Sequence, residues 1–284
     1  MQQIMQQIMQ KVILITGATD GIGFETAKVL VEQGHHVLLH GRNPDKLKGV
    51  ESELATIAAA NNATIESYEA DLSSLKDTVS LADSLKEKHT KIDVLINNAG
   101  VFNTANPITK DDLDVRFVVN TIAPYLLTLR LLPLLGETSR VVNLSSAAQS
   151  TVSVEAILGK KSLSDGEAYA QSKLAITMWT RELAEKTVKN ELNGKGPMLV
   201  AVNPASLLGS KMVKDAYGVA GGDLSIGSDI LVRAALSDEF ANASGLYFDN
   251  DRGVFSKPHP DALNDDKVRN VVQAIEGVID SILA

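Results

Sequence analysis

Tyr169 and Lys173 lie one helical turn apart in the segment Tyr169-Ala-Gln-Ser-Lys173. Residues four apart share one face of an α-helix, so the phenol and the ammonium would lie together. A nearby cation lowers the pKa of a phenol from its usual value of about 10. A phenol placed in this way can pass a proton to or from an alcohol oxygen near neutral pH. Taken alone, the same spacing also fits an amphipathic helix with Lys173 as a solvated charge.

A glycine-rich turn near the start of the chain points to a nucleotide. Gly17, Gly21 and Gly23 follow an apolar run over 11–16 and open a helical pattern over 21–33. Glycines allow a tight turn and the close approach of a pyrophosphate, and the N–H groups at a helix start attract its charge. A glycine-rich turn without a ligand is the alternative. The predicted cofactor contacts in this turn are Gly17, Thr19, Asp20, Gly21, Ile22 and Gly23.

The end of the next predicted strand bears on the choice of cofactor. It continues as His40-Gly41-Arg42-Asn43, without the acidic side chain that binds the ribose 2′-hydroxyl in NAD sites. Arg42 offers a planar guanidinium for a 2′-phosphate instead. Arg42 and Asn43 are therefore the predicted contacts at this end, and NADP(H) is favoured over NAD. A solvated loop charge is the alternative for Arg42.

Further short motifs follow along the chain in a fixed order. Together with the first two, they are Thr16-Gly17-x-x-x-Gly21-Ile22-Gly23, Asp71-Leu72, Asn97-Asn98-Ala99-Gly100, Asn120, Ser145-Ser146, Tyr169-x-x-x-Lys173 and Asn203-Pro204. With these motifs, the chain resembles the short-chain dehydrogenase/reductase family over nearly its whole length from residue 11. The long gap between Ser146 and Tyr169 resembles the carbonyl reductase and retinol dehydrogenase-like branch, in which an insertion sits beside the active site.

The resemblance implies cofactor contacts at the ends of the third and fourth predicted strands. Asp71 and Leu72 would contact the adenine. Asn98, Ala99 and Gly100 would form the wall under the adenosine ribose and the turn into the next helix.

The resemblance also places residues at the nicotinamide. Pro204 would begin the segment that covers the nicotinamide, and Lys173 would hold its ribose beside Tyr169. The family usually has Pro-Gly where this chain has Pro204-Ala205. The added methyl of Ala205 would narrow the pocket or stiffen the loop, which affects substrate fit more than hydride chemistry.

A catalytic set of Asn120, Ser146, Tyr169 and Lys173 follows from the resemblance. Tyr169 would be the general acid in reduction and the base in oxidation, with its pKa lowered by Lys173. Ser146 would hold the substrate oxygen while Ser145 is structural, and Asn120 would hold a water near Lys173. Considered singly, Asn120 also fits a helix-interior amide, and the serine pair fits a plain loop start.

The predicted function is the reduction of a ketone or aldehyde to an alcohol, or the reverse, by hydride transfer with NADP(H). One alternative is a catalytically silent sensor or scaffold of the same fold, and another is an epimerase or dehydratase acting on a nucleotide sugar. Apolar side chains in a predicted lid over 205–225 favour a bulky hydrophobic small molecule as substrate. The sequence leaves open which substrate, which stereochemistry and which direction of reaction apply.

The elements that must position these residues alternate between strands and helices. The predicted strands occupy 11–16, 37–40, 64–70, 92–96, 140–144 and 199–203, with a short one near 245–248. The predicted helices occupy 21–33, 44–60, 74–88, 111–135, 166–190 and 266–282. Such alternation gives right-handed crossovers between parallel strands. We therefore expect a single α/β domain over 11–284, a three-layer, Rossmann-type, doubly wound parallel sheet.

Composition narrows the class of protein. The chain has 284 residues, 44% hydrophobic residues and a net charge of −8, which suits one large core. It has no basic block for nucleic acid and no cysteine for a disulfide, a thiolate metal site or a nucleophile. The five histidines lack metal-ligand spacing, so no metal site is predicted. No apolar run is expected to span a membrane, so a soluble cytoplasmic protein is the expectation.

The first ten residues form a predicted extension before the domain. Met1-Gln2-Gln3-Ile4 is repeated as Met5-Gln6-Gln7-Ile8, and a third copy begins at Met9. The repeat lacks the features of a secretory signal. Because Met9 would be a natural start, residues 1–8 fit an added or alternative extension.

Self-association into a homodimer or homotetramer is also expected. Relatives of this family commonly pair through the two long helices beside the site, here 111–135 and 166–190. The apolar residues assigned to this interface are Leu126, Leu127, Leu131, Leu134, Ile176, Met178 and Trp179.

Overall fold

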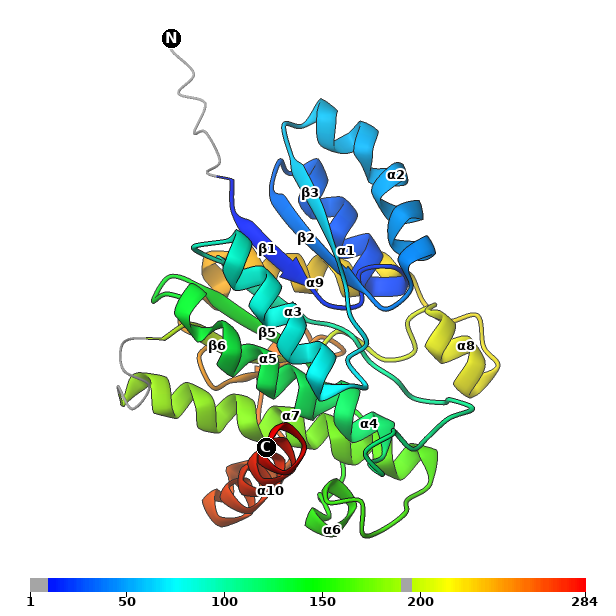
Figure 1. Cartoon of the computed structure of the whole chain (residues 1–284), viewed down its shortest axis with the longest axis vertical. Helices are drawn as coiled ribbons and strands as arrows, with labels where there is room; N and C mark the ends of the chain where they lie inside the picture. The colour runs from blue at the N-terminus through cyan, green and yellow to red at the C-terminus, as the bar shows by residue number, and fades with distance from the viewer. Residues whose placement is uncertain (1–9, 190–195) are drawn as a thin grey trace.

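One sheet runs through the middle of the protein, and a computed structural model describes residues 10–189 and 196–284 (Figure 1). Across the described residues the strand order is β3-β2-β1-β4-β5-β6-β7-β8, with β8 alone antiparallel to its neighbour. This order confirms the expected doubly wound parallel sheet, and it reverses between β1 and β4. The strands are β1 (Val12–Ile15), β2 (His36–Gly41), β3 (Thr64–Glu69), β4 (Val94–Asn97), β5 (Arg140–Leu144), β6 (Met198–Asn203), β7 (Tyr247–Asp249) and β8 (Val254–Ser256).

Successive residues of each central strand point to opposite faces of the sheet and so build two cores. In β1, Ile13 and Ile15 belong to one core, and Leu14 belongs to the other. The helices on the first face are α1 (Gly21–Glu32), α2 (Pro44–Ala60) and α9 (Leu224–Leu236). The helices on the second face are α3 (Leu75–Lys88), α5 (Ala123–Leu131), α7 (Asp165–Val188) and α10 (Asp265–Leu283).

Polar side chains cap the N-termini of three helices beside the predicted site. The side chain of Asp20 caps α1, and that of Asn43 caps α2 just before Pro44. A capping box begins α7, because the Ser164 side chain accepts from the backbone N–H of Glu167 and the Glu167 carboxylate accepts from Ser164. These caps satisfy N–H groups that have no partner inside the helix. The start of α7 in turn fixes where Tyr169 and Lys173 lie.

The long helix expected over 111–135 is interrupted near its middle. A short helix, α4 (Val115–Phe117), runs into a wider π-helical turn over Val118–Ile122 before α5 begins, and a 3₁₀ turn over Leu132–Leu134 ends the run. In the π turn, the Ala123 N–H donates to the carbonyl of Val118, five residues before it. Pro124 has no N–H to donate to the carbonyl of Asn120, so the ordinary helical pattern cannot continue there. The π turn therefore surrounds Asn120, which had been predicted only as a helical residue.

The same run corrects the expectation about membrane-spanning length. By length and composition, the helix over Val115–Leu134 is apolar enough to cross a membrane. Within the fold, 78% of its most apolar stretch is buried. Its side chains pack between the sheet, α3 and α7.

Four elements were not predicted from the sequence. The expected lid over 205–225 contains one of them and the start of another, and the remaining two lie near the site and at the edge of the sheet. They are α6 (Val154–Ile157), α8 (Lys211–Tyr217), α9 and β8. Three of the four span seven residues or fewer, which is too short for periodicity to reveal.

The C-terminal helix α10 corrects the argument for self-association. It packs against α7 and α3, and the Tyr125 hydroxyl on α5 donates to the Glu276 carboxylate on α10 at 2.7 Å. Every side chain assigned to the subunit interface is therefore buried inside one chain and cannot serve as the exposed apolar surface that was expected. Those side chains are Leu126, Leu127, Leu131, Leu134, Ile176, Met178 and Trp179.

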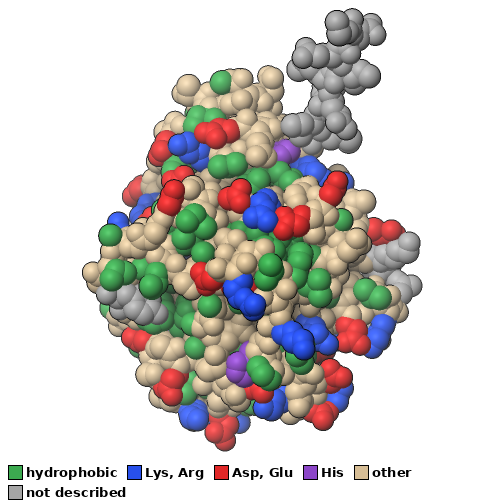
Figure 2. Space-filling model, turned by 180° about the vertical axis from the view of Figure 1, so that it is seen from behind, with side chains coloured by type: hydrophobic (Ala, Val, Ile, Leu, Met, Phe, Trp, Pro, Cys, Tyr) green, Lys and Arg blue, Asp and Glu red, His purple; other side chains and the backbone are tan. Residues whose placement is uncertain are grey.

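The surface carries charges of both signs. On the face shown in Figure 2, acidic and basic side chains are interspersed with apolar ones. Most of the predicted extension, residues 1–9, lies outside the described residues. The side chain of Gln10 is described, and it donates to the carbonyls of Gly34 and Asn62 at 3.1 Å each.

Candidate active site

Tyr169 and Lys173 lie on one face of α7, as their spacing predicted. The Lys173 side chain is buried, and its Nζ lies 5.6 Å from the centroid of the Tyr169 ring. The same Nζ donates to the carbonyl of Leu144, at the end of β5, at 2.8 Å. Burial lowers the pKa of Lys173 to about 8, because desolvation disfavours the charged form. At neutral pH the ammonium is still the main form, and it stands beside the phenol.

The Tyr169 ring packs against an aromatic side chain that sequence reasoning missed. The ring centroids of Phe102 and Tyr169 are 4.7 Å apart, with the planes tilted by 57°. Phe102 lies two residues beyond Gly100, in the loop after β4. An aromatic residue so close to the Asn97–Gly100 motif was the available signal, since loops at this edge of an open α/β sheet build its site.

Asn120 connects the loop after β4 to α7. Its carboxamide exchanges two hydrogen bonds with the backbone of Val101, at 2.8 and 2.9 Å, and also donates to Ser172 Oγ at 2.9 Å. Ser172 in turn donates to the carbonyl of Tyr169 at 2.7 Å. A methyl built on Gly100 would lie 3.6 Å from Asn120 Oδ1 and 3.7 Å from Lys173 Nζ. The predicted residues Gly100, Asn120 and Lys173 thus meet at one place.

The two neighbouring serines have different environments. The Ser145 hydroxyl donates to the carbonyl of Lys173 at 3.0 Å and pairs with Thr177 at 2.7 Å, so it fastens β5 to α7. Ser146 is partly exposed, and its hydroxyl accepts from the N–H of Ala148 at 3.1 Å. That bond leaves the hydroxyl proton of Ser146 available for a substrate oxygen, whereas Ser145 already uses its own.

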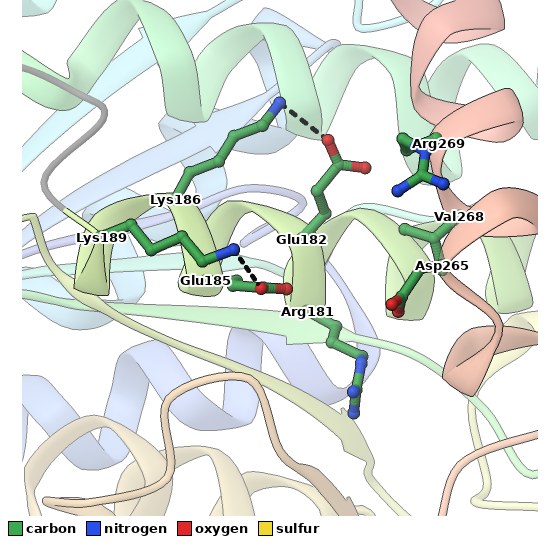
Figure 3. A pocket seen from close by; sticks show the side chains of 8 residues that line it. All are labelled: Arg181, Glu182, Glu185, Lys186, Lys189, Asp265, Val268 and Arg269. Carbon is green, nitrogen blue, oxygen red and sulfur yellow. Dashed lines mark ion pairs between the residues drawn. The ribbon is translucent and has the colours of Figure 1, made fainter.

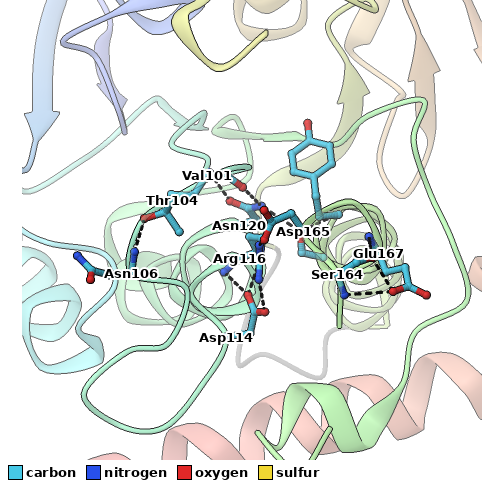
Figure 4. Close-up of polar contacts among 11 residues, drawn as sticks. Val101, Thr104, Asn106, Asp114, Arg116, Asn120, Ser164, Asp165 and Glu167 are labelled. Carbon is cyan, nitrogen blue, oxygen red and sulfur yellow. Dashed lines mark hydrogen bonds and ion pairs between the residues drawn. The ribbon is translucent and has the colours of Figure 1, made fainter. Parts of the chain in front are cut away.

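A buried arginine network lies beside the site and was not predicted (Figure 4). The Arg116 side chain is 2% exposed, and it donates to Asp114 through Nε at 2.8 Å and Nη2 at 2.6 Å. Arg116 also donates to Asp165, the first residue of α7. The bonds to Asp114 and then Asp165 outweigh burial and raise the pKa of Arg116. This ion-pair network joins the start of α4 to the start of α7, one helical turn from Asn120 and Tyr169.

The glycine turn between β1 and α1 has the geometry that its sequence predicted. Gly17 and Gly21 adopt φ values of +68° and +55°, which favour glycine. A methyl on Gly23 would lie 2.2 Å from the carbonyl oxygen of Gly17, so only hydrogen fits there. The Asn98 side chain donates to the carbonyls of Thr16 and Gly17 at 2.9 and 3.0 Å, which ties the turn to the end of β4.

His40 fixes the same turn from the side of β2. Its Nδ1 accepts from the N–H of Gly17 at 3.2 Å, so Nε2 carries the proton that is donated to the carbonyl of Ala70 at 3.1 Å. Burial lowers the pKa of His40 to about 4, which keeps the ring neutral at physiological pH. Sequence reasoning considered His40 only as a metal ligand and missed this contact.

The predicted ribose end lies where β2 meets α2. Arg42 is exposed, as a ligand for a 2′-phosphate would have to be. Asn43 caps α2 by accepting from the N–H of Lys46 at 2.9 Å, and Lys46 Nζ lies 3.3 Å from the Asp20 carboxylate. A methyl on Gly41 would lie 2.6 Å from the Thr19 side chain, so a larger residue there would displace Thr19.

The residues predicted at the adenine use their side chains elsewhere. The Asp71 carboxylate accepts from the N–H of Ser73 at 2.9 Å, and the Leu72 side chain is buried in the core under α3. Ala99 lies against Gly17, since a methyl on Gly17 would lie 2.9 Å from Ala99 Cα.

The lid passes over the glycine turn and the Asn120 cluster. A methyl on Gly21 would lie 3.6 Å from Ser210 Cβ, and one on Gly100 would lie 3.6 Å from Met212 Cε. The two ends of the lid are joined by backbone hydrogen bonds between Leu207–Gly209 and Gly222. Gly209 and Gly221 let two backbone segments of the lid touch, because a methyl on Gly221 would lie 2.5 Å from Gly209 Cα.

Comparisons with known proteins identify the family of this chain. Residues 11–216 match the family described as short chain dehydrogenase. The chain belongs to the short-chain dehydrogenase family. Mouse retinol dehydrogenase 12 is 34% identical over 255 residues, which cover 85% of this chain and 78% of that relative. This dehydrogenase is therefore an oxidoreductase of the retinol dehydrogenase-like branch.

Solved structures share its fold. An uncharacterized protein from Mycobacterium paratuberculosis superposes with a TM-score of 0.77 at 24% identity, covering 95% of this chain and 94% of that chain. A short chain dehydrogenase from Escherichia coli complexed with NADPH superposes with a TM-score of 0.65 at 25% identity, covering 84% and 96%.

A charged groove elsewhere on this dehydrogenase is unrelated to the predicted site (Figure 3). It has a volume of about 320 Å³ and lies between α7 and α10. Its nearest residue on α7, Arg181, lies twelve positions beyond Tyr169, which is about 18 Å along a helix. Lys186 pairs with Glu182 at 2.8 Å across one turn of α7 inside the groove. Among the described residues, no group of three or more His, Asp or Glu side chains could hold a metal ion.

Proposed function

We propose that this oxidoreductase reduces a hydrophobic ketone or aldehyde to an alcohol, or catalyses the reverse reaction, with NADP(H) as cofactor and Tyr169 as general acid and base. The observation that carries the proposal is the pair formed by Tyr169 and the buried Lys173, with Nζ 5.6 Å from the ring centroid. The Ser145 hydroxyl is bonded to Lys173 and Thr177, so the Ser146 hydroxyl is the one assigned to the substrate. Mouse retinol dehydrogenase 12, a relative that is 34% identical, supports the reaction class.

The glycine turn fits a dinucleotide. Gly17 and Gly21 have positive φ values, and no side chain larger than hydrogen fits at Gly23. The first turn of α1 presents N–H groups and the positive end of the helix dipole to a pyrophosphate. Residues Gly17–Gly23 would hold the pyrophosphate, and Lys173 would reach the nicotinamide ribose. The Asp20 carboxylate lies nearby, and Lys46 balances its charge.

In this proposal each polar side chain of the site has one task. The bound nicotinamide would supply or accept the hydride. Tyr169 gives its proton to the carbonyl oxygen in reduction and takes a proton from the alcohol in oxidation. Lys173, with its pKa of about 8, stays protonated at neutral pH and favours ionisation of the phenol. Ser146 donates to the substrate oxygen and so opposes the charge that develops there.

Asn120 contributes through its position in the π turn. Its carboxamide is occupied by Val101 and Ser172, so the side chain acts as a support for the loop after β4. In an ordinary α-helix the backbone carbonyl of Asn120 would accept from the N–H of residue 124, but Pro124 has no N–H to donate. We assign to this carbonyl the water that would carry protons between Lys173 and solvent.

The predicted substrate is a bulky apolar small molecule. Phe102 packs on Tyr169, and Met212 of the lid reaches Gly100 beside Lys173. These apolar surfaces would bind a hydrocarbon group next to the reacting carbon.

The proposal also places the protein in the cytoplasm, which fractionation of the producing cells would test.

The exchange Tyr169→Phe tests the assigned acid. The variant keeps the ring that packs on Phe102 and loses only the hydroxyl, so cofactor binding should stay within about twofold of wild type. Loss of a positioned acid lowers kcat by about 10²–10⁴-fold. The measurement is NADPH oxidation with a panel of ketones and aldehydes. A Tyr169→Phe variant with nearly wild-type kcat would exclude Tyr169 as the acid.

Arg42→Ala tests the choice of cofactor. Charge-assisted hydrogen bonds are worth about 1.5–3 kcal/mol, so Arg42 should favour NADPH over NADH by about 10- to 150-fold. The E. coli neighbour complexed with NADPH supports this choice. The ratio of kcat/KM for the two cofactors should fall toward one in Arg42→Ala, with Lys48→Ala, an exposed lysine on α2, as control. Gly41→Asp is a poorer test, because its side chain would displace Thr19.

A further inference from the structure

The segment that follows β6 contains residues in backbone conformations that favour glycine. Ala205 has a φ of +120° and Leu207 a φ of +53°. In a residue with a Cβ, such conformations are strained and persist only when surrounding contacts enforce them. The segment forms the start of the lid, in which Ser210 and Met212 lie over Gly21 and Gly100. Some other part of the chain must hold this segment in place.

The turn between β7 and β8 makes those contacts. The Asp251 carboxylate accepts from the N–H and the hydroxyl of Ser206, at 2.7 and 2.6 Å, and from the Asn203 side chain at 2.9 Å. The Asn250 side chain donates to the carbonyl of Pro204 at 3.0 Å. Hydrogen bonds from this turn therefore flank Ala205 on both sides.

The ionised form of Asp251 is the form that these bonds need. Burial opposes ionisation, but the bonds from Ser206 and Asn203 outweigh it and lower the pKa of Asp251. A carboxylate only accepts, and its three partners are all donors, so the match is complete. Bonds of this kind are stronger than neutral ones because the acceptor carries a charge.

The same hairpin also reaches the candidate catalytic serine. The Tyr247 hydroxyl on β7 donates to the carbonyl of Ser146 at 3.1 Å. One short hairpin at the edge of the sheet thus contacts both the loop that carries Ser146 and the base of the lid.

We propose that Asp251 is a positioning residue that, through its bonds to Ser206, holds Ala205 in the strained conformation which keeps the lid over the cofactor. The inference rests on the proposed function, since the lid matters only if a cofactor lies beneath it. Asp251 acts through Ser206 and Asn203, to which it bonds. The position of Ser206 in turn sets where Ser210 and Met212 lie.

Asp251→Asn tests the proposal with little change in shape. The new amide would set an NH₂ group against the donors of Ser206 or Asn203, so at least one bond is lost. The Kd for NADPH, measured by the fluorescence of bound NADPH, should rise about tenfold, and kcat at saturating NADPH should stay within about threefold. Tenfold corresponds to about 1.4 kcal/mol, near the worth of one charge-assisted bond.

Asp249→Asn is the matched control on the same hairpin. Asp249 accepts from Asn203 and from the N–H of Asp251 through the same oxygen, Oδ1. An asparagine amide can keep an oxygen at that place, so NADPH affinity should change less than twofold. If both variants weaken NADPH equally, loss of negative charge explains the effect and the positioning role of Asp251 is excluded.

Ala205→Gly supplies the decisive combination. Glycine adopts the positive φ without strain, so the segment should then depend less on Asp251. The double variant Ala205→Gly, Asp251→Asn should recover at least half of the lost affinity on a logarithmic scale. Strict additivity of the two changes would contradict the proposal. Should Asp251→Asn fail to fold, Ser206→Ala, which removes only the 2.6 Å bond, should raise the Kd for NADPH about threefold.

Limited trypsin digestion separates this proposal from the proposed function. Lys211 and Lys214 are exposed on α8 of the lid. Trypsin cleavage after these lysines does not depend on the oxidoreductase activity of the protein. Asp251→Asn should be cut there several times faster than wild type or Asp249→Asn. Equal cleavage rates would overturn the positioning role even if the enzyme reduces carbonyls. Faster cleavage in a protein that oxidises no NADPH would keep the role of Asp251 and contradict the proposed function.

Discussion

Two strand-to-helix connections at the same edge of the sheet achieve unusual backbone shapes in different ways. The turn after β1 carries its positive φ values on Gly17 and Gly21, where they cause no strain. The segment after β6 carries them on Ala205 and Leu207, where they do. The first connection is shaped by its own residue types. The second is shaped by a carboxylate that stands 45 positions further along the chain.

The difference shows in what supports each connection. The turn after β1 is held by His40 and Asn98, which lie on neighbouring strand ends and need only fix a shape that the glycines already allow. The segment after β6 needs Asp251 to enforce its shape. Adding a side chain to the glycine turn after β1 should therefore disrupt its backbone. Removing the side chain of Ala205 in the segment after β6 should instead relieve its strain.

The largest effect, a loss of both stability and cofactor binding, is expected from Gly23→Ala in the first connection. The new methyl would lie 2.2 Å from the Gly17 carbonyl and 2.4 Å from the Asn98 side chain, so the backbone must move. Overpacking of this kind costs about 1–3 kcal/mol, and the displaced N–H groups should weaken NADPH binding by more than tenfold. Isothermal titration and urea unfolding measure the two effects.

Gly49→Ala is the control for that prediction. Gly49 lies within α2, and a methyl there would meet nothing within 4 Å. Alanine favours a helix, so the control should be stabilised by up to about 1 kcal/mol. Unchanged NADPH affinity in Gly23→Ala would show that the turn after β1 does not bind the pyrophosphate.

An intermediate effect is expected from His40→Gln, and it should depend on pH. The pKa of His40 is lowered to about 4 from 6.5, so below pH 6.5 the unfolded chain takes up a proton that the folded chain does not. The contribution of neutral His40 is complete above pH 6.5 and is lost as the pH falls toward 4. The loss amounts to about 3 kcal/mol, at 1.36 kcal/mol per pKa unit.

The measurement is the free energy of unfolding of wild type and His40→Gln between pH 7 and pH 4. Glutamine does not titrate, so the difference between the two proteins should shrink as the pH falls. A difference that stays constant would show that His40 is not held neutral. It would also weaken the view that the glycine turn is fixed by a hydrogen bond to Nδ1.

The smallest effect is expected from Ala205→Gly in the second connection. Relief of the positive φ should stabilise the protein by up to about 1 kcal/mol, which is about 2–4 °C in Tm for a chain of this size. Ala55→Gly, on the exposed side of α2, should do the opposite and destabilise by about 0.5–1 kcal/mol. A lower Tm in Ala205→Gly would mean that Ala205 carries no strain.

Local signals explain how far the sequence could be interpreted. The bounds predicted for β5 and α2 agree with the structure, because an apolar run and a capped helical pattern are each contained within one element. The π turn was missed because it depends on Pro124 together with the contacts of Asn120 to a distant loop. The side chains predicted to form an interface on α5 and α7 are buried within the chain, and a long apolar face has the same sequence pattern whichever chain buries it.

The sequence alone determined the glycine turn, the Tyr169–Lys173 spacing, the order of the strands along the chain and the family. The glycine turn and the Tyr169–Lys173 pair each depend on residues close together in the chain, where spacing has a fixed geometric meaning. The family depends on many such short motifs in a fixed order. The tertiary structure decided that Ser145 bonds to Lys173 and Thr177, that Arg116 joins α4 to α7, and that Asp251 bonds to Ser206. These contacts join residues far apart in the chain, and no periodicity connects them. A hydrogen bond between distant residues becomes visible only when the fold brings its two atoms together.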